Sequence, residues 1–314
     1  MHVVKPPLIT IGVLNHNGVR RLRRCLPSLL HQEYPNVQLL VADNGSSDGS
    51  VEYLQHLRVK TIYFRKNRGY GCAKNELVRQ AKGDYVFLLD NDIECPNNAV
   101  QQLLFDYREL GDTGFLSPLV QDIDKNTLRC LGLKFTRLQS HLHPDDLERT
   151  GILRVNGFHG GAVFFKRQLF CNLGGYDDIF PIHLDDYDLS ARAALQQVPC
   201  FASTNVKLIH HGVEISDSRL QFRQKFYLAG FSRMMWKNYS WPNLLLWFPA
   251  ALSWILVKAL RVSLHHQTPT PLFGVVQSAH VFLCSFPSTL RMRKTVQASR
   301  TVREDVFLNE IPAK

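Results

Sequence analysis

Short apolar runs alternate with stretches of helical periodicity through the first 120 residues of the chain. The runs end at turn-forming residues, as strands do, whereas the intervening stretches repeat apolar residues every three or four positions, as helices do. We expect strands at residues 8–14, 37–43, 60–64, 85–89 and 114–120, and helices at 19–31, 50–57, 70–81 and 98–110. This alternation predicts βαβ units, and therefore an α/β fold with a mainly parallel sheet covered by helices on both faces.

The chain becomes polar and irregular between residues 121 and 155. It contains acidic and histidine-rich stretches such as Asp122-Ile123-Asp124 and His141-Leu142-His143. This composition favours a loop or lid over an element of the central sheet.

Two acids follow the most apolar of the predicted strands. The run at 85–89 leads directly into Asp90, Asn91 and Asp92. Open α/β sheets bind their ligands at the carboxyl ends of buried parallel strands. Acids spaced one residue apart point to the same side of an extended chain, and hard cations prefer carboxylate oxygens together with substrate phosphates. The pattern predicts a site for Mg²⁺ or Mn²⁺, and the alternative is a solvated acidic loop.

Polar residues also follow the other predicted strands. Asn15 and Asn17 come after the first strand, and Asp43 and Asn44 after the second. An acid at such a strand end can accept hydrogen bonds from a nucleobase or a ribose. A glycine turn that begins at Asn67 leads into a helix with a nearby cation, Lys74, which suits a phosphate. Turn formation and helix capping are the alternative explanation for each of these residues.

Positive charge is concentrated in the last hundred residues. Residues 219–314 hold thirteen Lys or Arg and three Asp or Glu, a balance of +10 that equals the balance of the whole chain. The first 218 residues are therefore neutral overall, which argues against a nucleic-acid-binding core. A basic tail of this kind favours an anionic partner surface such as a membrane.

The same C-terminal region contains an apolar run at residues 241–257. Its length is near the lower limit of about 17 residues for a membrane-spanning helix. Its tryptophans and Pro249 favour a kinked helix or one that lies in the membrane interface. The alternative is a core helix that packs on the rest of the protein. We therefore expect a catalytic domain at 1–218 and a basic, partly hydrophobic helical region at 219–314.

The seven cysteines are scattered, without a C-x-x-C pair. This spacing favours a reducing compartment over a disulfide framework or a zinc site. The N-terminus leads directly into the first strand without the apolar core of a secretory signal. Together with the basic tail, these features predict a protein at the cytoplasmic face of the cell membrane.

Several short motifs occur in one order along residues 8–215. They read Asn15-His16-Asn17, Val41-Ala42-Asp43-Asn44-Gly45-Ser46-Ser47-Asp48-Gly49-Ser50, Asn67-Arg68-Gly69, Asp90-Asn91-Asp92, Gly174-Gly175-Tyr176-Asp177, Asp185-Asp186-Tyr187-Asp188-Leu189 and His210-His211-Gly212. In number and order they resemble the inverting glycosyltransferases of family 2, which have the GT-A fold, and the rhamnosyltransferase-like members in particular. Asp185 stands where the family usually has Glu, and Ala42 where it has Val. The family's Q-x-x-R-W motif is absent, which argues against a processive polysaccharide synthase.

The resemblance implies a role for each motif. Residues 1–120 become a nucleotide-sugar half and residues 121–218 an acceptor half. Asp186 becomes the general base, with Asp185 beside it. Asp92, Asp90 and His210 become the ligands of Mg²⁺ or Mn²⁺. The residues implied to bind the nucleotide sugar are Asn15, Asn17, Asp43, Asn44, Asn67, Gly69, Lys74, Asp90 and Asn91.

The resemblance also implies the reaction partners. The donor is a nucleotide-diphosphate sugar, with dTDP-rhamnose as the first expectation and UDP- or GDP-sugars behind it. The acceptor is a glycan or a lipid-linked glycan in cell-surface polysaccharide synthesis. Two alternatives are a sugar-phosphate nucleotidyltransferase and a catalytically inactive, membrane-tethered binding protein. A nucleotidyltransferase normally has a glycine-rich basic loop after its first strand, where this chain has Asn15-His16-Asn17-Gly18.

Overall fold

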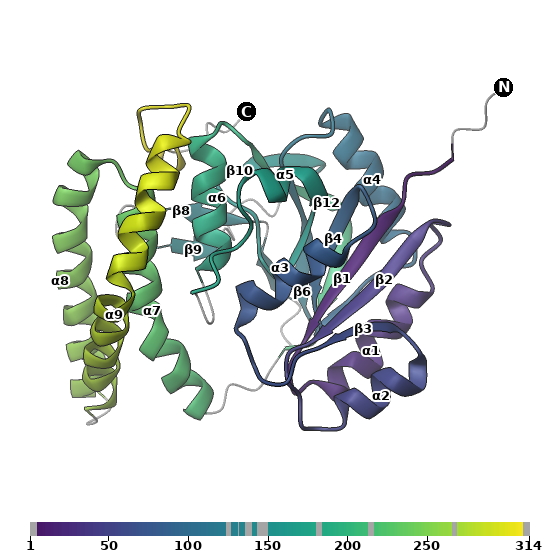
Figure 1. Cartoon of the computed structure of the whole chain (residues 1–314), viewed down its shortest axis with the longest axis horizontal. Coiled ribbons are helices and arrows are strands. Elements are labelled where there is room, and N and C mark those ends of the chain that lie inside the picture. The colour runs from purple at the N-terminus through teal and green to yellow at the C-terminus, as the bar shows by residue number, and fades with distance from the viewer. Residues whose placement is uncertain are drawn as a thin grey trace.

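A computed structural model describes residues 5–123, 127–130, 132–135, 140–142, 150–179, 184–212, 217–265 and 269–309. Its centre is a ten-stranded sheet with the order β10-β12-β6-β11-β4-β1-β2-β3, to which β5 and β7 add short pairings (Figure 1). The strands are β1 (Ile9–Asn15), β2 (Val37–Asp43), β3 (Lys60–Tyr63), β4 (Tyr85–Asp90), β5 (Ile93–Glu94), β6 (Phe115–Asp122), β7 (Thr127–Cys130), β10 (Ile152–Val155), β11 (Ala162–Lys166) and β12 (Cys200–His210). A separate two-stranded sheet pairs β8 (Leu133–Phe135) with β9 (Ser140–Leu142).

The sheet is parallel in its N-terminal half and mixed in the remainder. Strands β4, β1, β2 and β3 run parallel to one another, as the sequence predicts. Strand β11 lies between β4 and β6 and is antiparallel to both, whereas β12 is parallel to β6. The predicted α/β fold is therefore confirmed, with an antiparallel strand inserted at the middle of the sheet.

Helices cover both faces of the sheet. They are α1 (Val19–Leu30), α2 (Ser50–Leu57), α3 (Tyr70–Gln80), α4 (Ala99–Glu109), α5 (Arg167–Asn172) and α6 (Asp185–Leu195). Apolar residues of α1, α2 and α4 pack on one face, against side chains such as Ile11 and Phe87. Residues of α3, α5 and α6 pack on the other face, against Val86 and Leu88, which flank Phe87 on β4. Because side chains alternate along a strand, the continuous apolar run of β4 supplies both cores.

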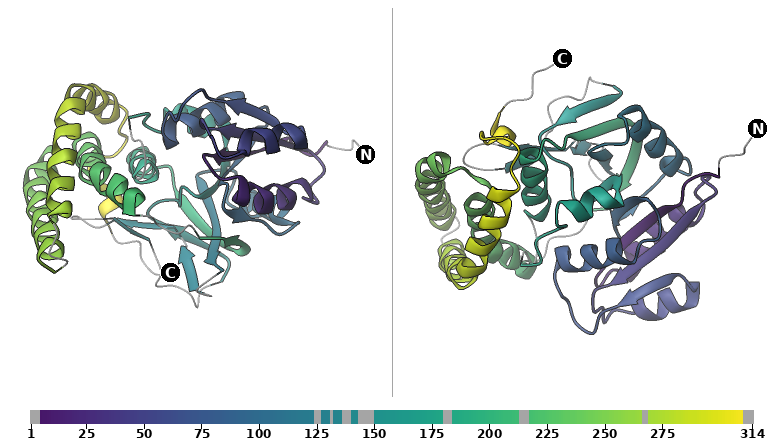
Figure 2. Two further views of the ribbon diagram at one scale, coloured as in Figure 1. Left: turned by 90° about the horizontal axis from the view of Figure 1, so that it is seen from below. Right: turned by 45° about the horizontal axis from the view of Figure 1, so that its top comes forward.

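Helix α6 is buried on two sides. Leu189 and Ala193 face the sheet, whereas Tyr187, Ala191 and Leu195 contact a third apolar cluster formed with the C-terminal helices. Those helices are α7 (Asp217–Asn238), α8 (Trp241–His265) and α9 (Thr270–Ala298), followed by the short helix η1 (Val306–Leu308). They lie together at the end of the molecule opposite β3, with α6 between them and the sheet (Figures 1 and 2).

The expectation that residues 121–155 form only a loop or lid is wrong for the part that the structure describes. Strand β7 pairs with β6, and β10 forms the edge of the sheet next to β12. Each pairs with a single neighbouring strand and lies at the periphery of the sheet. Such strands do not need the continuous apolar run from which the central strands were predicted. Residues 124–126, 131, 136–139 and 143–149 of this predicted loop lie outside the described residues.

Helix α8 contains the predicted apolar run and continues through Pro249 to His265. Within the described ranges, one helix, α8, has the length and apolar composition to cross a membrane. Of its most apolar stretch of 18 residues, 22% is buried within the protein. A core helix would be mostly buried, so the larger part of this surface faces away from the protein.

Candidate active site

The polar residues predicted at three strand ends lie side by side. Asn15, Asp43 and Asp90 are the last residues of β1, β2 and β4. In the register of the sheet Asn15 pairs with Asp43, and Leu14 pairs with Asp90. The parallel arrangement therefore gathers the predicted site on one edge of the sheet, as carboxyl ends of parallel strands do.

Asn15 and Asp43 form a buried hydrogen-bond network. Asn15 Nδ2 donates to Asp43 Oδ1 over 2.8 Å, and Asn15 Oδ1 accepts from Asn91 Nδ2. The Asp43 carboxylate also accepts from the backbone N–H of Ser46 at 3.0 Å and from its hydroxyl at 2.6 Å. Asp43 is 1% exposed, so this network shields its carboxylate from solvent.

Asn44 joins two turns at the same edge. Its Nδ2 donates to Asn67 Oδ1 and to the carbonyl of Gly69, both at 3.0 Å, and its Oδ1 accepts from the backbone of Arg68. Gly69 has a φ of 90°, a conformation that favours glycine. Nearby, Asn17 Oδ1 accepts from the backbone of Ser47 at 2.8 Å. The predicted Asn and Gly residues thus shape the turns, and their contact with a donor stays a prediction.

Asp90 is held by two residues of α3. Its Oδ1 lies 3.0 Å from Lys74 Nζ and accepts a 2.6 Å hydrogen bond from the hydroxyl of Tyr70. Burial raises the pKa of Asp90, against the lowering effect of the Lys74 ammonium. Lys74 is itself fully buried. In this conformation the Lys74 ammonium forms an ion pair with Asp90. The contact of Lys74 with a phosphate and the role of Asp90 as a metal ligand both stay predictions.

Asp92 lies next to His210, the last residue of β12. Its Oδ2 is 3.3 Å from His210 Nε2, while His210 Nδ1 is 2.6 Å from Asp122 Oδ1. The short contact to Asp122 holds the imidazole so that Nε2 faces Asp92. This is the arrangement in which a carboxylate orients a histidine that binds a metal.

The residues at this point fit a divalent cation. Among the described residues, no group of three or more His, Cys, Asp or Glu side chains is arranged to hold a metal. Mg²⁺ in phosphate chemistry commonly uses one or two protein carboxylates and takes its other ligands from water and substrate phosphates. Asp92 matches that use, and the metal role of His210 stays a prediction.

Asp185 and Asp186 begin α6 and differ in their surroundings. Asp186 is partly exposed, and its oxygens accept from the backbone N–H groups of Gly160 at 3.0 Å and Tyr187 at 2.9 Å. Asp185 is buried, and its Oδ2 has no hydrogen-bond partner. Burial raises the pKa of Asp186 to about 6, and burial together with the charge of Asp186 raises the pKa of Asp185 to about 8.

Gly160 connects the two sets of carboxylates. Its carbonyl accepts from Lys74 Nζ at 2.5 Å and from Tyr70 at 3.1 Å, and its N–H donates to Asp186. A Cβ at this position would lie 3.0 Å from Asp186 Oδ2, so only glycine allows this approach without displacement. Gly160, Tyr70 and Asp122 are not among the site residues predicted from the sequence. The Gly160-Gly161 pair before an apolar run was the available signal for Gly160.

The arrangement can perform acid–base chemistry beside a phosphate. A carboxyl group with a pKa near 6 is largely ionised at neutral pH and still accepts a proton from a polarised hydroxyl. A cation held by Asp92 and His210 can neutralise a diphosphate at the same sheet edge. The predicted catalytic and metal-binding residues are therefore gathered at one edge.

The chain is similar in sequence to known glycosyltransferases. The model of the family described as "Glycosyl transferase family 2" matches residues 10–173. An uncharacterized glycosyltransferase of Haemophilus influenzae is 33% identical over 103 residues, which cover 31% of this chain and 41% of that protein. The chondroitin synthase of Escherichia coli is 33% identical over 108 residues, or 33% of this chain and 16% of the synthase. The chain thus matches less than half the length of these two curated relatives.

The solved structures show a shared fold. The mannosyltransferase PcManGT from Pyrobaculum calidifontis, in complex with GDP-Man and Mn²⁺, superimposes with a TM-score of 0.56 at 18% sequence identity. The match covers 94% of this chain and 86% of the mannosyltransferase. It therefore includes the C-terminal region as well as the sheet.

Proposed function

Because the chain belongs to glycosyl transferase family 2, we propose that it is an inverting glycosyltransferase that moves a sugar from a nucleotide diphosphate to an acceptor hydroxyl. The observation that carries this proposal is the position of Asp186. This partly exposed carboxylate is joined through Gly160 to the strand end that presents Asp90 and Asp92. A base and a diphosphate site at one edge are the two requirements of a direct displacement.

Asp186 acts as the general base in this proposal. It takes the proton of the acceptor hydroxyl while the hydroxyl oxygen attacks the anomeric carbon from the side opposite the diphosphate, which inverts the configuration. Asp185 is buried and protonated at neutral pH, so it places no second negative charge beside the base. Asn15, Asp43, Asn44 and the turn at Asn67 line the nucleotide end of the site.

Asp92 and His210 would hold Mg²⁺ or Mn²⁺, with Asp90 beside them. The cation, when bound, supplies charge neutralisation for the departing diphosphate. The mannosyltransferase of the same fold was solved with Mn²⁺, which supports testing Mn²⁺ first.

We propose dTDP-rhamnose as the first donor to test, followed by UDP- and GDP-sugars. The rhamnosyltransferase-like order of the motifs supports the first choice, and the GDP-Man in the structural neighbour supports the inclusion of GDP-sugars. A glycan or lipid-linked glycan of the cell surface is the proposed acceptor. The similarity to a chondroitin synthase supports this acceptor class.

The proposed location is the cytoplasmic face of the cell membrane. Large apolar side chains of α8 and α9 are exposed, among them Leu246, Leu264 and Phe273. Leu246, Val257, Leu260 and Leu264 are spaced so that they follow one side of α8. Exposed basic residues on the same two helices, including Lys258 and Arg291, complement an anionic lipid surface.

The function is tested with the full chain, Mn²⁺ and a panel of nucleotide sugars. Thermal-shift screening selects the donor, because a ligand at one hundred times its dissociation constant adds about 2.7 kcal/mol to the stability of the folded state. We expect one donor to be hydrolysed slowly alone and to be transferred to an acceptor with inversion. Retention of the anomeric configuration, or formation of a nucleotide sugar from a sugar phosphate, would reject the proposal.

A further inference from the structure

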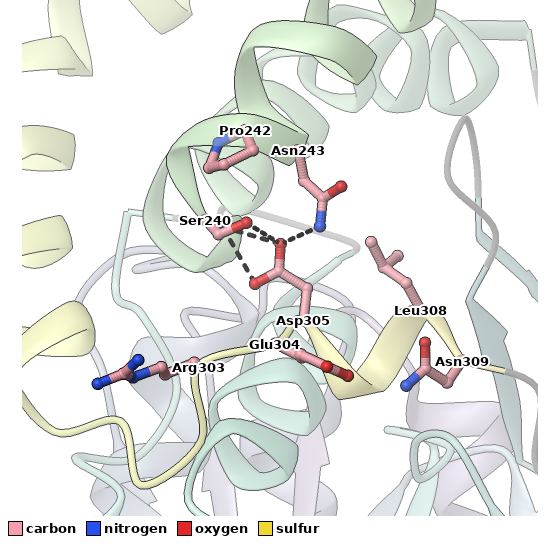
Figure 3. A pocket seen from close by; sticks show the side chains of 8 residues that line it. All are labelled: Ser240, Pro242, Asn243, Arg303, Glu304, Asp305, Leu308 and Asn309. Carbon is pink, nitrogen blue, oxygen red and sulfur yellow. Dashed lines mark hydrogen bonds between the residues drawn. The ribbon is translucent and has the colours of Figure 1, made fainter.

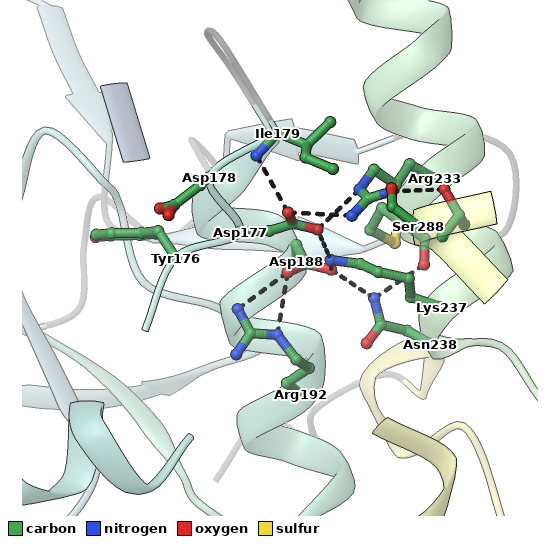
Figure 4. A network of polar contacts seen from close by, with 12 residues as sticks. Tyr176, Asp177, Asp178, Ile179, Asp188, Arg192, Arg233, Lys237, Asn238 and Ser288 are labelled. Carbon is green, nitrogen blue, oxygen red and sulfur yellow. Dashed lines mark hydrogen bonds and ion pairs between the residues drawn. The ribbon is translucent and has the colours of Figure 1, made fainter. Parts of the chain in front are cut away.

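A buried cluster of charges joins α6 to the C-terminal helices. It consists of Asp177, Asp188, Arg192, Arg233 and Lys237, and none of these side chains is more than 4% exposed (Figure 4). Asp188 and Arg192 belong to α6, and Arg233 and Lys237 belong to α7. Asp177 belongs to the segment that precedes α6. The cluster therefore connects parts of the chain that lie far apart in sequence.

Each carboxylate has a guanidinium of its own. Arg233 donates from Nε and Nη2 to the two oxygens of Asp177, at 2.8 and 3.2 Å. Arg192 donates from Nε to Asp188 Oδ2 at 3.0 Å, and Asn238 Nδ2 donates to Asp188 Oδ1 at 2.9 Å. Two carboxylates are thus paired with two guanidinium groups before Lys237 is considered.

Lys237 is a third cation that bridges the two pairs. Its Nζ contacts Asp177 Oδ2 and lies 2.7 Å from Asp188 Oδ1. Burial lowers the pKa of Lys237, against the raising effect of Asp188 and Asp177. A fully buried ammonium costs desolvation free energy, and Asp177 and Asp188 do not require it for neutrality. Arg192 also donates to the backbone carbonyls of Leu173 and Gly175. Lys237 adds a second link, between the side chains of Asp177 and Asp188.

Both segments lead to the proposed active site. Asp188 lies in the first turn of α6, two residues after the proposed base Asp186. Tyr176 and Asp177 pack against Gly71, where an added Cβ would lie 3.1 Å from Tyr176 Cβ and 3.2 Å from the carbonyl of Asp177. Gly71 follows Tyr70, which holds Asp90. Lys237 thereby ties the base to the helix that holds the donor-side carboxylate.

We propose that Lys237 is a positioning residue that fixes Asp186 relative to Tyr70 and Asp90, which makes α7 part of the catalytic unit. This inference rests on the proposed function of Asp186 as the base. A bound geometry that is wrong by about 1 Å can cost on the order of a hundredfold in rate. Loss of the link should therefore slow the chemical step while donor binding persists.

The test compares Lys237→Met and Lys237→Arg with a control in another buried ion pair. Arg300 Nη2 lies 2.9 Å from Asp305 Oδ1, and Asp305 accepts from Ser240 and Asn243 at the start of α8 (Figure 3). Arg300→Met removes a buried cation whose partner, Asp305, binds the start of α8. Lys237→Met removes a buried cation that contacts Asp188 in the first turn of α6. Thermal unfolding measures the stability lost by each variant.

We expect Lys237→Met to lower kcat by about tenfold to a hundredfold with the donor KM changed by less than about twofold. Lys237→Arg should recover part of this loss, and Arg300→Met should keep kcat within about twofold of wild type at a comparable loss of stability. Hydrogen exchange provides a readout that does not depend on activity. Lys237→Met should speed exchange in the peptide 184–190, which contains the Tyr187 amide bound to Asp186, and Arg300→Met should not.

Wild-type kcat in Lys237→Met, or unchanged exchange in 184–190, would overturn the inference. Equal losses of kcat in Lys237→Met and Arg300→Met would assign the effect to general destabilisation and also overturn it. A wild-type chain that transfers no sugar would reject the proposed function instead. In that case the exchange measurement still decides whether Lys237 holds the start of α6.

Discussion

The backbone N–H of Gly160 donates a 3.0 Å hydrogen bond to Oδ2 of Asp186. Since the carbonyl of the same residue accepts from Lys74, the backbone of one residue links the proposed base to the cation that holds Asp90. Asp186 is thus oriented by backbone groups, which have fewer degrees of freedom than side chains. Such support from a rigid neighbour is what a general base needs to meet a hydroxyl in the correct direction.

Asp186→Asn should abolish transfer and leave donor binding nearly intact. The substitution keeps the shape and one of the two acceptor contacts, since Gly160 and Tyr187 donate to different oxygens, and it removes the group that takes the proton. General-base catalysis typically contributes about a hundred- to ten-thousandfold. Single-turnover rates and calorimetric titration with the donor measure the two effects. A variant that retains more than about a tenth of wild-type turnover would contradict the assignment of the base.

Transfer should depend on pH with an acid limb near the pKa of Asp186. Burial raises this pKa to about 6, so the base is protonated and inactive below that pH and becomes active as the pH rises through it. The dependence of kcat/KM on pH in the free enzyme measures this value. Asp185→Asn should keep the limb near the same pH, because Asp185 itself is protonated there. A limb near pH 4 would indicate a solvated carboxylate and contradict the raised pKa of Asp186.

Asp92→Ala should weaken binding of the nucleotide diphosphate when Mg²⁺ or Mn²⁺ is present. The substitution removes a hard oxygen ligand from the proposed cation site and the carboxylate that faces His210 Nε2. Treatment of the wild type with a chelator should reproduce the effect. Calorimetry with and without metal provides the measurement. Equal affinity of the wild type under both conditions would exclude a metal that bridges protein and phosphates.

Charged substitutions on α8 should release the protein from anionic vesicles. Leu246→Glu and Leu264→Glu place acids among side chains that are 62% and 70% exposed. Phe105→Glu is the matched control, because Phe105 is 57% exposed on α4. Co-sedimentation with vesicles measures binding, and high salt should weaken it, since surface charges are screened. A wild-type chain that never binds would contradict the membrane location.

Point substitutions suit this experiment better than truncation after residue 218. The boundary expected between residues 218 and 219 follows the change in charge along the sequence. In the structure, Leu228, Phe231 and Met235 of α7 share an apolar cluster with Tyr187 and Leu195 of α6. Removal of α7 would expose this cluster and disturb the start of α6. A loss of vesicle binding could then not be assigned to the exposed side chains of α8.

Much of the local structure could be predicted from the sequence. Strand β2 and helix α2 have the predicted bounds, and β4 ends at the acid that marked the site. Each of these elements has an apolar pattern and a turn residue within its own stretch of sequence. Strand β10 was missed, because an edge strand with one neighbour lacks the apolar run.

The sequence by itself determined the local elements, the strand ends that carry Asn15, Asp43 and Asp90, and the acids at the start of α6, because periodicity and turn chemistry act over a few residues. Only the tertiary structure decided which of two adjacent acids is partly exposed, since Asp186 meets Gly160 across 26 residues. It also buried Lys74 against Asp90 and brought Lys237 to Asp177 across 60 residues. Contacts of this range depend on how whole elements pack, and no short pattern in the chain encodes them.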